Sequence, residues 1–294
     1  MAEDDWPQER LYFDRHMTRP EGLAVAGGRA AVFSACSPAK DTPNEDAAAV
    51  IPFNGWAGVL AVADGLGGVP AGEHAAEIAL RALKTAIRQG ARDAALLRTA
   101  ILDGLEEANR RVQALGVGAA TTIAVIELQE TSVRPYHVGD SMILVVGQRG
   151  KVKLETISHS PVAFAVEAGF LDKEEAMHHE DRHLVSNVIG SPAMKIEIGP
   201  TIKLAPRDTV LLASDGLSDN LHTEEIIERV RKGPIEAAAA GLAADAARRM
   251  TEPKNDQPSK PDDLTFILFR RRGPGETRFW HSCATTRTAA KNRR

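Results

Sequence analysis

The chain has few cysteines, few aromatic residues and no long apolar run. Its only cysteines, Cys36 and Cys283, cannot build a disulfide framework, which suits a reducing compartment. Aromatic residues make up 4% of the chain, so the core must rest on Ala, Val, Leu and Ile. No apolar run approaches the roughly 18 residues of a membrane span. The start at Met1 lacks a basic region followed by an apolar stretch, so no signal peptide is apparent and we expect a cytoplasmic protein.

The charge of the chain is uneven along its length. The formal net charge of −4 gives no reason to expect nucleic-acid binding by the whole protein. Residues 272–294, however, are strongly basic and have no periodic apolar pattern, which predicts a disordered, solvated tail. The alternative is that this tail docks onto an acidic partner or a membrane surface.

The apolar patterns predict one domain at 22–271, preceded by a loosely held arm at 1–21. Helices are predicted from three- and four-residue apolar spacing and from capping signals, at 76–87, 97–115, 223–232 and 234–250. Strand-like runs lie at 30–36, 47–53, 58–63, 121–128, 132–138, 142–147, 196–204, 209–213 and 264–269. Residues 160–194 are more polar and helix-like. Strands grouped at both ends, with a helical pair between them, favour an α+β domain in which helices cover antiparallel sheets.

Four short acidic segments lie far apart in the chain, each where a strand-like run begins or ends. They are Asn44-Glu45-Asp46, Asp64-Gly65-Leu66-Gly67-Gly68, Ser214-Asp215-Gly216-Leu217 and Pro261-Asp262-Asp263-Leu264-Thr265. Any one of them alone is explained as well by an ordinary turn or a solvated loop. If the fold gathers them, they form an oxygen-rich pocket suited to hard divalent ions such as Mg²⁺ or Mn²⁺. Such a pocket would bind phosphate oxygens and activate water.

The glycine-rich segment after Asp64 does not match a nucleotide-binding loop. Gly65 and Gly67 are followed by Pro70 where a dinucleotide fingerprint needs its third glycine. The Lys-Ser/Thr pair of a Walker A loop is also missing. An acid directly before two close glycines instead suits a metal ligand whose backbone must bend sharply.

In their order, these segments resemble the type 2C metal-dependent protein phosphatases, the PPM family, from about Ala31 to Phe269. Further motifs that carry the resemblance are Gly118–Thr122, Val138-Gly139-Asp140-Ser141, Ser158-His159-Ser160, Glu167–Leu171, Glu174-Glu175-Ala176 and Val188-Ile189-Gly190. The resemblance implies an antiparallel β-sandwich flanked by helices on both faces, with a flap at about 160–190. It implies two Mn²⁺ or Mg²⁺ ions at one end and a bacterial-type enzyme that hydrolyses phosphoserine and phosphothreonine with metal-activated water.

The resemblance also assigns roles to individual residues. The implied metal ligands are Glu45, Asp64, the carbonyl of Gly65, Asp215, Asp262 and, for a third and weaker ion, Asp140. Asp64 would bridge the two main ions, and Asp46 would act mainly through metal-bound waters. Phosphorylated proteins are the implied substrates, and a cognate Ser/Thr kinase is the expected partner.

The chain departs from the family pattern where the substrate phosphate would bind. Asp41 stands at the position where the family usually has an arginine, and no arginine occurs between Arg29 and Arg81. Lys40 lies one residue earlier, and we expect it to replace the arginine in part, as a point charge rather than a bidentate fork. Leu66 stands where eukaryotic members often have a histidine, which indicates a bacterial type.

Two other functions are consistent with the same residues. The first is a pseudophosphatase that binds phosphoproteins as a regulatory module, which Asp41, Met142 and Ser158 favour because they depart from the family pattern. Retention of the acidic ligands argues against it, since like charges held together cost stability. The second is a phosphatase for a small phosphorylated metabolite. A histidine cluster at 178–183 could indicate zinc, but we predict solvated flap residues there.

Overall fold

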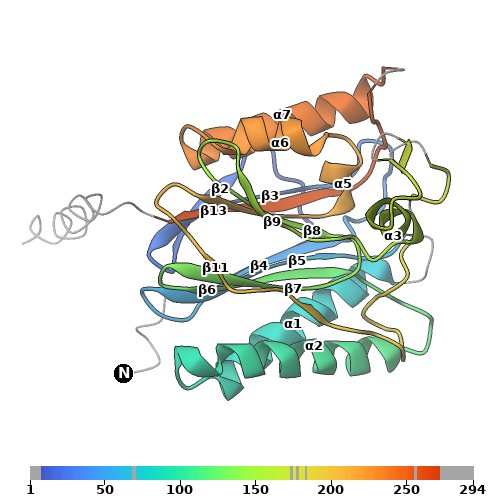
Figure 1. The fold of residues 1–294 in the computed structure, drawn as a ribbon. Helices are drawn as coiled ribbons and strands as arrows, with labels where there is room; N and C mark the ends of the chain where they lie inside the picture. Colours follow the sequence, from blue (N-terminus) through green and yellow to red (C-terminus); the bar gives the residue numbers. More distant parts are fainter. Residues whose placement is uncertain are drawn as a thin grey trace, which may run out of the picture.

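The computed structural model describes residues 8–67, 71–172, 175–176, 179–182, 184–254 and 257–271. Two antiparallel β-sheets lie face to face, and helices cover the outer face of each sheet (Figure 1). This arrangement is the helix-flanked antiparallel sandwich that the sequence predicts, so the predicted fold class is confirmed. Among the described residues, no helix is long and apolar enough to cross a membrane.

The first sheet is covered by a pair of long helices. Its strands run in the order β1 (Arg10–Phe13), β4 (Asp46–Pro52), β5 (Ala57–Asp64), β6 (Ile123–Gln129), β7 (Ser132–Val138) and β10 (Glu197–Ile198), and β11 (Ile202–Lys203) also pairs with β7. The covering helices are α1 (Gly72–Gly90) and α2 (Leu97–Gln113), preceded by the short 3-10 helix η2 (Ala94–Leu96). Small residues of the sheet, such as Ala47 and Ala61, pack against Ala76 and Leu80 of α1 in one buried cluster. The small side chains of these alanines let the helix pair approach the sheet closely.

The second sheet is covered by helices from the C-terminal part of the chain. Its strands run in the order β2 (Glu21–Val25), β3 (Gly28–Ala35), β13 (Leu264–Arg271), β12 (Thr209–Ala213), β8 (Met142–Val146) and β9 (Val152–Glu155). The covering helices are α6 (Thr223–Val230) and α7 (Ile235–Thr251). The shorter α3 (Pro161–Glu167) and α5 (Asp215–Ser218) lie at one end of the sandwich (Figure 1).

Alternation of side chains along the strands separates the three layers of core. In β4, Ala47 and Ala49 belong to the cluster beneath α1, whereas Ala48 and Val50 belong to the cluster between the two sheets. Successive side chains of a strand point to opposite faces, so a run that is apolar throughout is buried on both faces. This explains why so few polar residues interrupt the strands.

Part of the predicted N-terminal arm at 1–21 is a strand, and this part of the prediction is wrong. Strand β1 pairs with β4, with Tyr12 opposite Ala48, and Tyr12 is 4% exposed. The segment Arg10-Leu11-Tyr12-Phe13 does not alternate between polar and apolar residues, so its sequence gives no strand signal, and pairing with β4 supplies the hydrogen bonds. The run predicted at 196–204 is two short strands, β10 and β11.

Three other predictions concern the polar stretch at 160–194, its histidine cluster and the basic tail, which the structure describes only in part or not at all. Of the polar stretch at 160–194, residues 161–167 form α3, and its N-cap is Ser160, whose Oγ accepts from the N–H of Ala163. His178, His183 and the basic tail at 272–294 lie outside the described residues. The solvated flap residues predicted at 178–183, with zinc as the alternative, and the solvated tail predicted at 272–294, with docking as the alternative, therefore stay predictions.

Candidate metal centre

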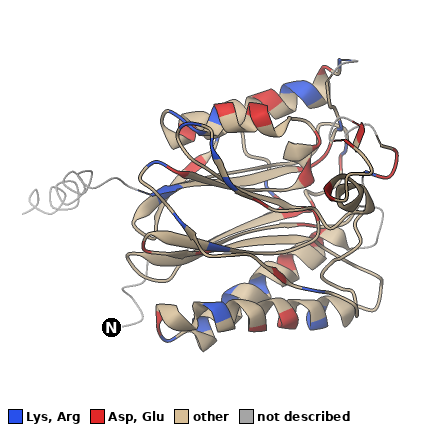
Figure 2. Ribbon diagram, viewed as in Figure 1, with Lys and Arg blue, Asp and Glu red and all other residues tan. Residues whose placement is uncertain are grey.

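The four acidic segments meet at one end of the sandwich, where acidic residues (red) gather beside α5 in Figure 2. In the first sheet, antiparallel pairing places Asp46 directly opposite Asp64. In the second sheet, β12 ends at Ala213, which lies opposite Phe266 of β13. Asp215 follows β12 and Asp262 precedes β13 at the same end of the sheet, because the end of one antiparallel strand lies beside the start of its neighbour.

Asp140, the predicted ligand of a third ion, lies in the turn that joins the two sheets. This turn connects β7 of the first sheet to β8 of the second. Strand β8 pairs with β12, with Met142 opposite Ala213, which brings Asp140 to the end of the sandwich that carries Asp215. The structure therefore brings together carboxylates from both sheets, as the sequence predicts.

Two glycines of the acidic segments allow the backbone to approach closely at the site. A Cβ atom on Gly65 would lie 2.3 Å from the carbonyl oxygen of Gly72, and one on Gly216 would lie 1.9 Å from the carbonyl oxygen of Asp263. No real side chain fits at such distances, so only glycine is tolerated. Gly65 N also donates to Glu45 O at 3.1 Å, which fixes the turn after β5 against the segment before β4.

Asp46 is the most informative carboxylate of the site because it is 2% exposed and only half satisfied. Its Oδ2 accepts a hydrogen bond from Ser214 Oγ at 2.7 Å. Its Oδ1 is buried and has no hydrogen-bond partner among the described residues. An unpaired buried carboxylate oxygen costs free energy, and such an oxygen in a native protein calls for a ligand, an ion or water.

The carboxyl groups of the cluster raise one another's pKa. Burial is the largest cause of the raised pKa values, and the charge of a neighbouring carboxylate is the next. The residues concerned are Asp46, Asp64, Asp140, Asp215 and Asp262. For Asp140, burial and then the charge of Asp215 raise the pKa to about 7. Cations that come close to these oxygens would favour the charged carboxylates and lower their pKa again. The donor set therefore fits divalent metal ions.

Lys40 lies at one edge of the cluster and is held by two carboxylates. Its Nζ lies 2.7 Å from Glu45 Oε2 and 2.7 Å from Asp263 Oδ2, and its side chain is 24% exposed. Burial by itself would lower the pKa of Lys40, but these two carboxylates raise it above its ordinary value. The predicted phosphate-binding lysine is thus at the site, paired with acids.

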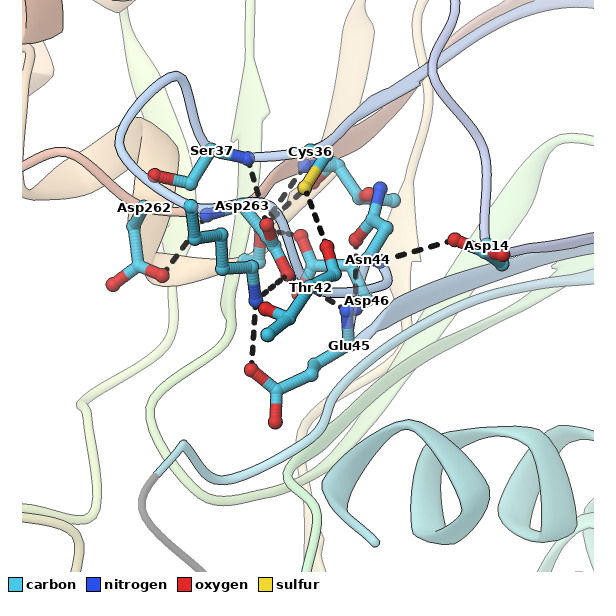
Figure 3. Close-up of polar contacts among 12 residues, drawn as sticks. Asp14, Cys36, Ser37, Thr42, Asn44, Glu45, Asp46, Asp262 and Asp263 are labelled. Atoms are coloured by element: carbon cyan, nitrogen blue, oxygen red, sulfur yellow. Dashed lines mark hydrogen bonds and ion pairs between the residues drawn. The ribbon is translucent and has the colours of Figure 1, made fainter.

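Asp263 belongs to one of the four acidic segments, but the sequence prediction gave it no role at the site. It is 4% exposed, and its carboxylate accepts the N–H groups of Ser37 and Glu45, each at 2.7 Å. Figure 3 shows the carboxylate between these two backbone segments. Asp263 therefore holds the backbone of Glu45, a predicted ligand. The Asp-Asp pair before β13 could have indicated this residue, because two adjacent acids serve different neighbours.

Lys260 and Asp219 are also at the site without having been predicted. The ammonium of Lys260 lies 2.8 Å from Asp215 Oδ2, 2.9 Å from Asp219 Oδ2 and 3.0 Å from Asp262 Oδ2. Burial works to lower the pKa of Lys260, but the three carboxylates raise it far above its ordinary value. Lys260 lies in the polar stretch between α7 and β13, where a lysine gives no signal of its own.

A second group of potential ligands lies beside the Asp140 turn. His137 and His159 stack at a ring distance of 4.4 Å, and His159 Nε2 lies 3.0 Å from Glu197 Oε2. Gly139 N donates to His159 Nδ1 at 3.0 Å, so the proton of a neutral His159 is on Nε2 and points to Glu197. Both ring nitrogens of His159 are therefore engaged, and we assign this group to support of the Gly139-Asp140 turn.

Comparison with known proteins places this geometry in a family. A sequence model of protein phosphatase 2C matches residues 38–252, and the chain belongs to this family. It is 32% identical over 177 residues to the protein phosphatase PhpP of Streptococcus pneumoniae, an alignment that covers 57% of this chain and 70% of that one.

Solved structures agree with this assignment. The serine/threonine phosphatase Stp1 of Staphylococcus aureus matches with a TM-score of 0.74 and 26% identity, over 88% of this chain and 99% of that one. The catalytic domain of the serine threonine protein phosphatase PstP, solved in complex with 2 manganese ions, matches with a TM-score of 0.66 and 25% identity, over 84% and 99%. The protein is accordingly a protein phosphatase of bacterial type, and these comparisons give no support to a binding module without activity.

Proposed function

We propose that this protein is a Mg²⁺- or Mn²⁺-dependent phosphatase that hydrolyses phosphoserine and phosphothreonine in proteins. The observation that carries the metal dependence is the buried Asp46, whose Oδ1 has no partner among the described residues. Burial raises the pKa of Asp46 most, and the charge of the neighbouring Asp263 raises it further. Divalent ions would complete the bonding of these oxygens and offset their mutual repulsion.

The residues that would hold the ions all offer oxygen. We assign to two ions the side chains of Glu45, Asp64, Asp215 and Asp262 and the carbonyl of Gly65, and to a third ion Asp140. Oxygen donors of this kind suit Mg²⁺ and Mn²⁺. When bound, such ions polarise phosphoryl oxygens and lower the pKa of water, which is the chemistry that hydrolysis of a phosphate ester needs.

The chain's own residues position this donor set. Ser214 holds Asp46 by a hydrogen bond at 2.7 Å, and Asp263 holds the backbone of Glu45. Lys40 is partly exposed at the edge of the set, and we propose that its ammonium contacts the substrate phosphate as a point charge. Lys40→Ala should then lower kcat/KM, mainly by raising KM. An unchanged kcat/KM in that variant would refute this role of Lys40.

The names of the relatives support proteins as the substrates. PhpP and Stp1 are named as a protein phosphatase and a serine/threonine phosphatase. A Ser/Thr kinase that phosphorylates the same proteins is the expected counterpart of such an enzyme. A small phosphorylated metabolite would be the alternative substrate, and a panel that compares a phosphothreonine peptide with such metabolites separates the two.

The proposal is tested by measuring hydrolysis of p-nitrophenyl phosphate and of a phosphothreonine peptide, with Mn²⁺ or with a chelator. Asp215→Asn keeps the shape of the ligand but removes its charge, so activity should fall to the level seen with chelator. Asp93→Asn is the matched control, because Asp93 is an exposed N-cap of η2 and should leave activity unchanged. Full activity with chelator, or in folded Asp215→Asn with Mn²⁺, would contradict the proposed metal dependence.

A further inference from the structure

Lys260 places a positive charge on carboxylates that the proposed function assigns to a metal ion. Its Nζ lies 2.8 Å from Asp215 Oδ2 and 3.0 Å from Asp262 Oδ2, and Asp219 accepts the same ammonium at 2.9 Å. The Lys260 side chain is 28% exposed, and those of Asp215 and Asp219 are each 20% exposed. Charges that are partly withdrawn from water attract more strongly than fully exposed pairs.

The position of Lys260 is built by the fold. Asn220, which is fully buried, accepts from Lys260 N at 2.9 Å and donates to Lys260 O at 2.8 Å. The same amide group donates to Gly216 O at 2.9 Å, in the turn of helix α5 that carries Asp215. Asn220 therefore ties the backbone of Lys260 to the backbone beside Asp215. The Lys260 side chain therefore extends to the carboxylates from a backbone position that hydrogen bonds hold in place.

A divalent ion held by Asp215 and Asp262 would compete with this ammonium for the same oxygens. Ions such as Mg²⁺ bind carboxylate oxygens at about 2.0–2.1 Å, well inside the hydrogen-bond distances that Lys260 now makes. An ion held by Asp215 and Asp262 would repel an ammonium bonded to the same groups. Asp219 is the partner of Lys260 that the proposed metal set does not use, so the ammonium can stay bonded there.

We propose that Lys260 is a tethered counter-ion that competes with one of the metal ions for Asp215 and Asp262. It offsets the repulsion between these carboxylates while no ion is bound, and it turns toward Asp219 when an ion binds. The affinity of this chain for that ion is consequently lower than its carboxylates alone would provide. The metal-free protein is more stable than it would be without the ammonium of Lys260. The inference rests on the proposed function, because that function assigns Asp215 and Asp262 as ligands.

The test is calorimetric titration with Mn²⁺ alone, without substrate, at one fixed pH. Lys260→Met removes the charge and keeps most of the apolar stem, so one Mn²⁺ should bind on the order of tenfold more tightly, as expected when a partly buried ion pair no longer competes. The thermal midpoint of the variant should fall in chelator, and Mn²⁺ should raise it by more than it does in the wild type. Lys153→Met is the matched control, because Lys153 also pairs with a buried aspartate, Asp208, in another part of the fold.

The outcomes separate this inference from the proposed function. Equal Mn²⁺ affinity in wild type and Lys260→Met, or the same gain in Lys153→Met, overturns the role of Lys260 alone. Absence of Mn²⁺ binding in the folded wild type overturns the metal assignment and this inference with it. If Lys260→Met does not fold in chelator, Lys260→Gln gives the same comparison, since it removes the charge and keeps a hydrogen-bond donor.

Discussion

Replacement of Asp263 by alanine tests whether the acidic end of the sandwich is held together by a single carboxylate. The Oδ1 atom of Asp263 accepts from Ser37 N and its Oδ2 atom accepts from Glu45 N, both at 2.7 Å. The partners come from segments more than two hundred positions away in the sequence. Lys40 pairs with the same Oδ2 atom. Alanine removes all three interactions and leaves the two backbone N–H groups without their acceptor.

The size of the effect follows from the type of bond and its burial. A hydrogen bond to a charged group contributes about 1.5–3 kcal/mol, so two of them give an upper range of about 3–6 kcal/mol. Water that reaches the loop beside the partly exposed Lys40 would hydrogen-bond the freed N–H groups and so reduce this loss of free energy. The ion pair between Lys40 and Asp263 itself adds little to stability. We therefore expect Asp263→Ala to lower the free energy of unfolding by about 2–4 kcal/mol.

The measurement is urea unfolding in chelator, so that metal binding does not contribute to the stability. Asp93→Ala is the matched control, because Asp93 also accepts one backbone N–H, that of Ala95, but is exposed. It should lose far less stability than Asp263→Ala. Equal losses in the two variants would refute the view that burial makes the Asp263 carboxylate the anchor of this site.

Two further predictions concern backbone packing and pH. Gly216→Ala would place a Cβ atom 1.9 Å from Asp263 O, so we expect the free energy of unfolding to fall by about 1–3 kcal/mol and the activity to be lost. Gly104→Ala is the control, because its Cβ atom would lie 2.9 Å from Leu83 Cα between α1 and α2; it should lower stability and leave the activity unchanged. Full activity in Gly216→Ala would contradict this prediction. Burial, and then His159, lower the pKa of His137 below its ordinary 6.5, so the stability from the neutral ring is full above pH 6.5 and is lost as the pH falls through the lowered value. His137→Gln should flatten the decline of the urea midpoint between about pH 7 and 5, and an unchanged decline would show that His137 does not cause it.

Much of the fold can be predicted from the sequence because its signals are local. The predicted helices at 76–87 and 97–115 correspond to α1 and α2, since three- and four-residue apolar spacing depends only on the chain itself. The strand runs were recognisable because both of their faces are buried. Strand β1 was missed because its pairing with β4, and not its own pattern, makes it a strand.

The site divides in the same way. The acidic segments could be recognised at strand ends, and their order along the chain suggested the family. Asp263 lies in one of these segments, but its partners and those of Lys260 could not be assigned, because they come from other parts of the chain, as with Asp263 and Ser37 or Lys260 and Asp215. Side chains of this kind carry no local periodicity, and only packing of the two sheets brings them to their partners.

The sequence by itself thus determined which residues could bind divalent ions, which segments form helices and buried strands, and which family the chain belongs to. The tertiary structure decided how these carboxylates are held and which cations they already meet. The physical reason is that helix and strand preference acts over a few residues. The electrostatic state of a carboxylate depends instead on every charge within several ångströms, whatever its position in the chain.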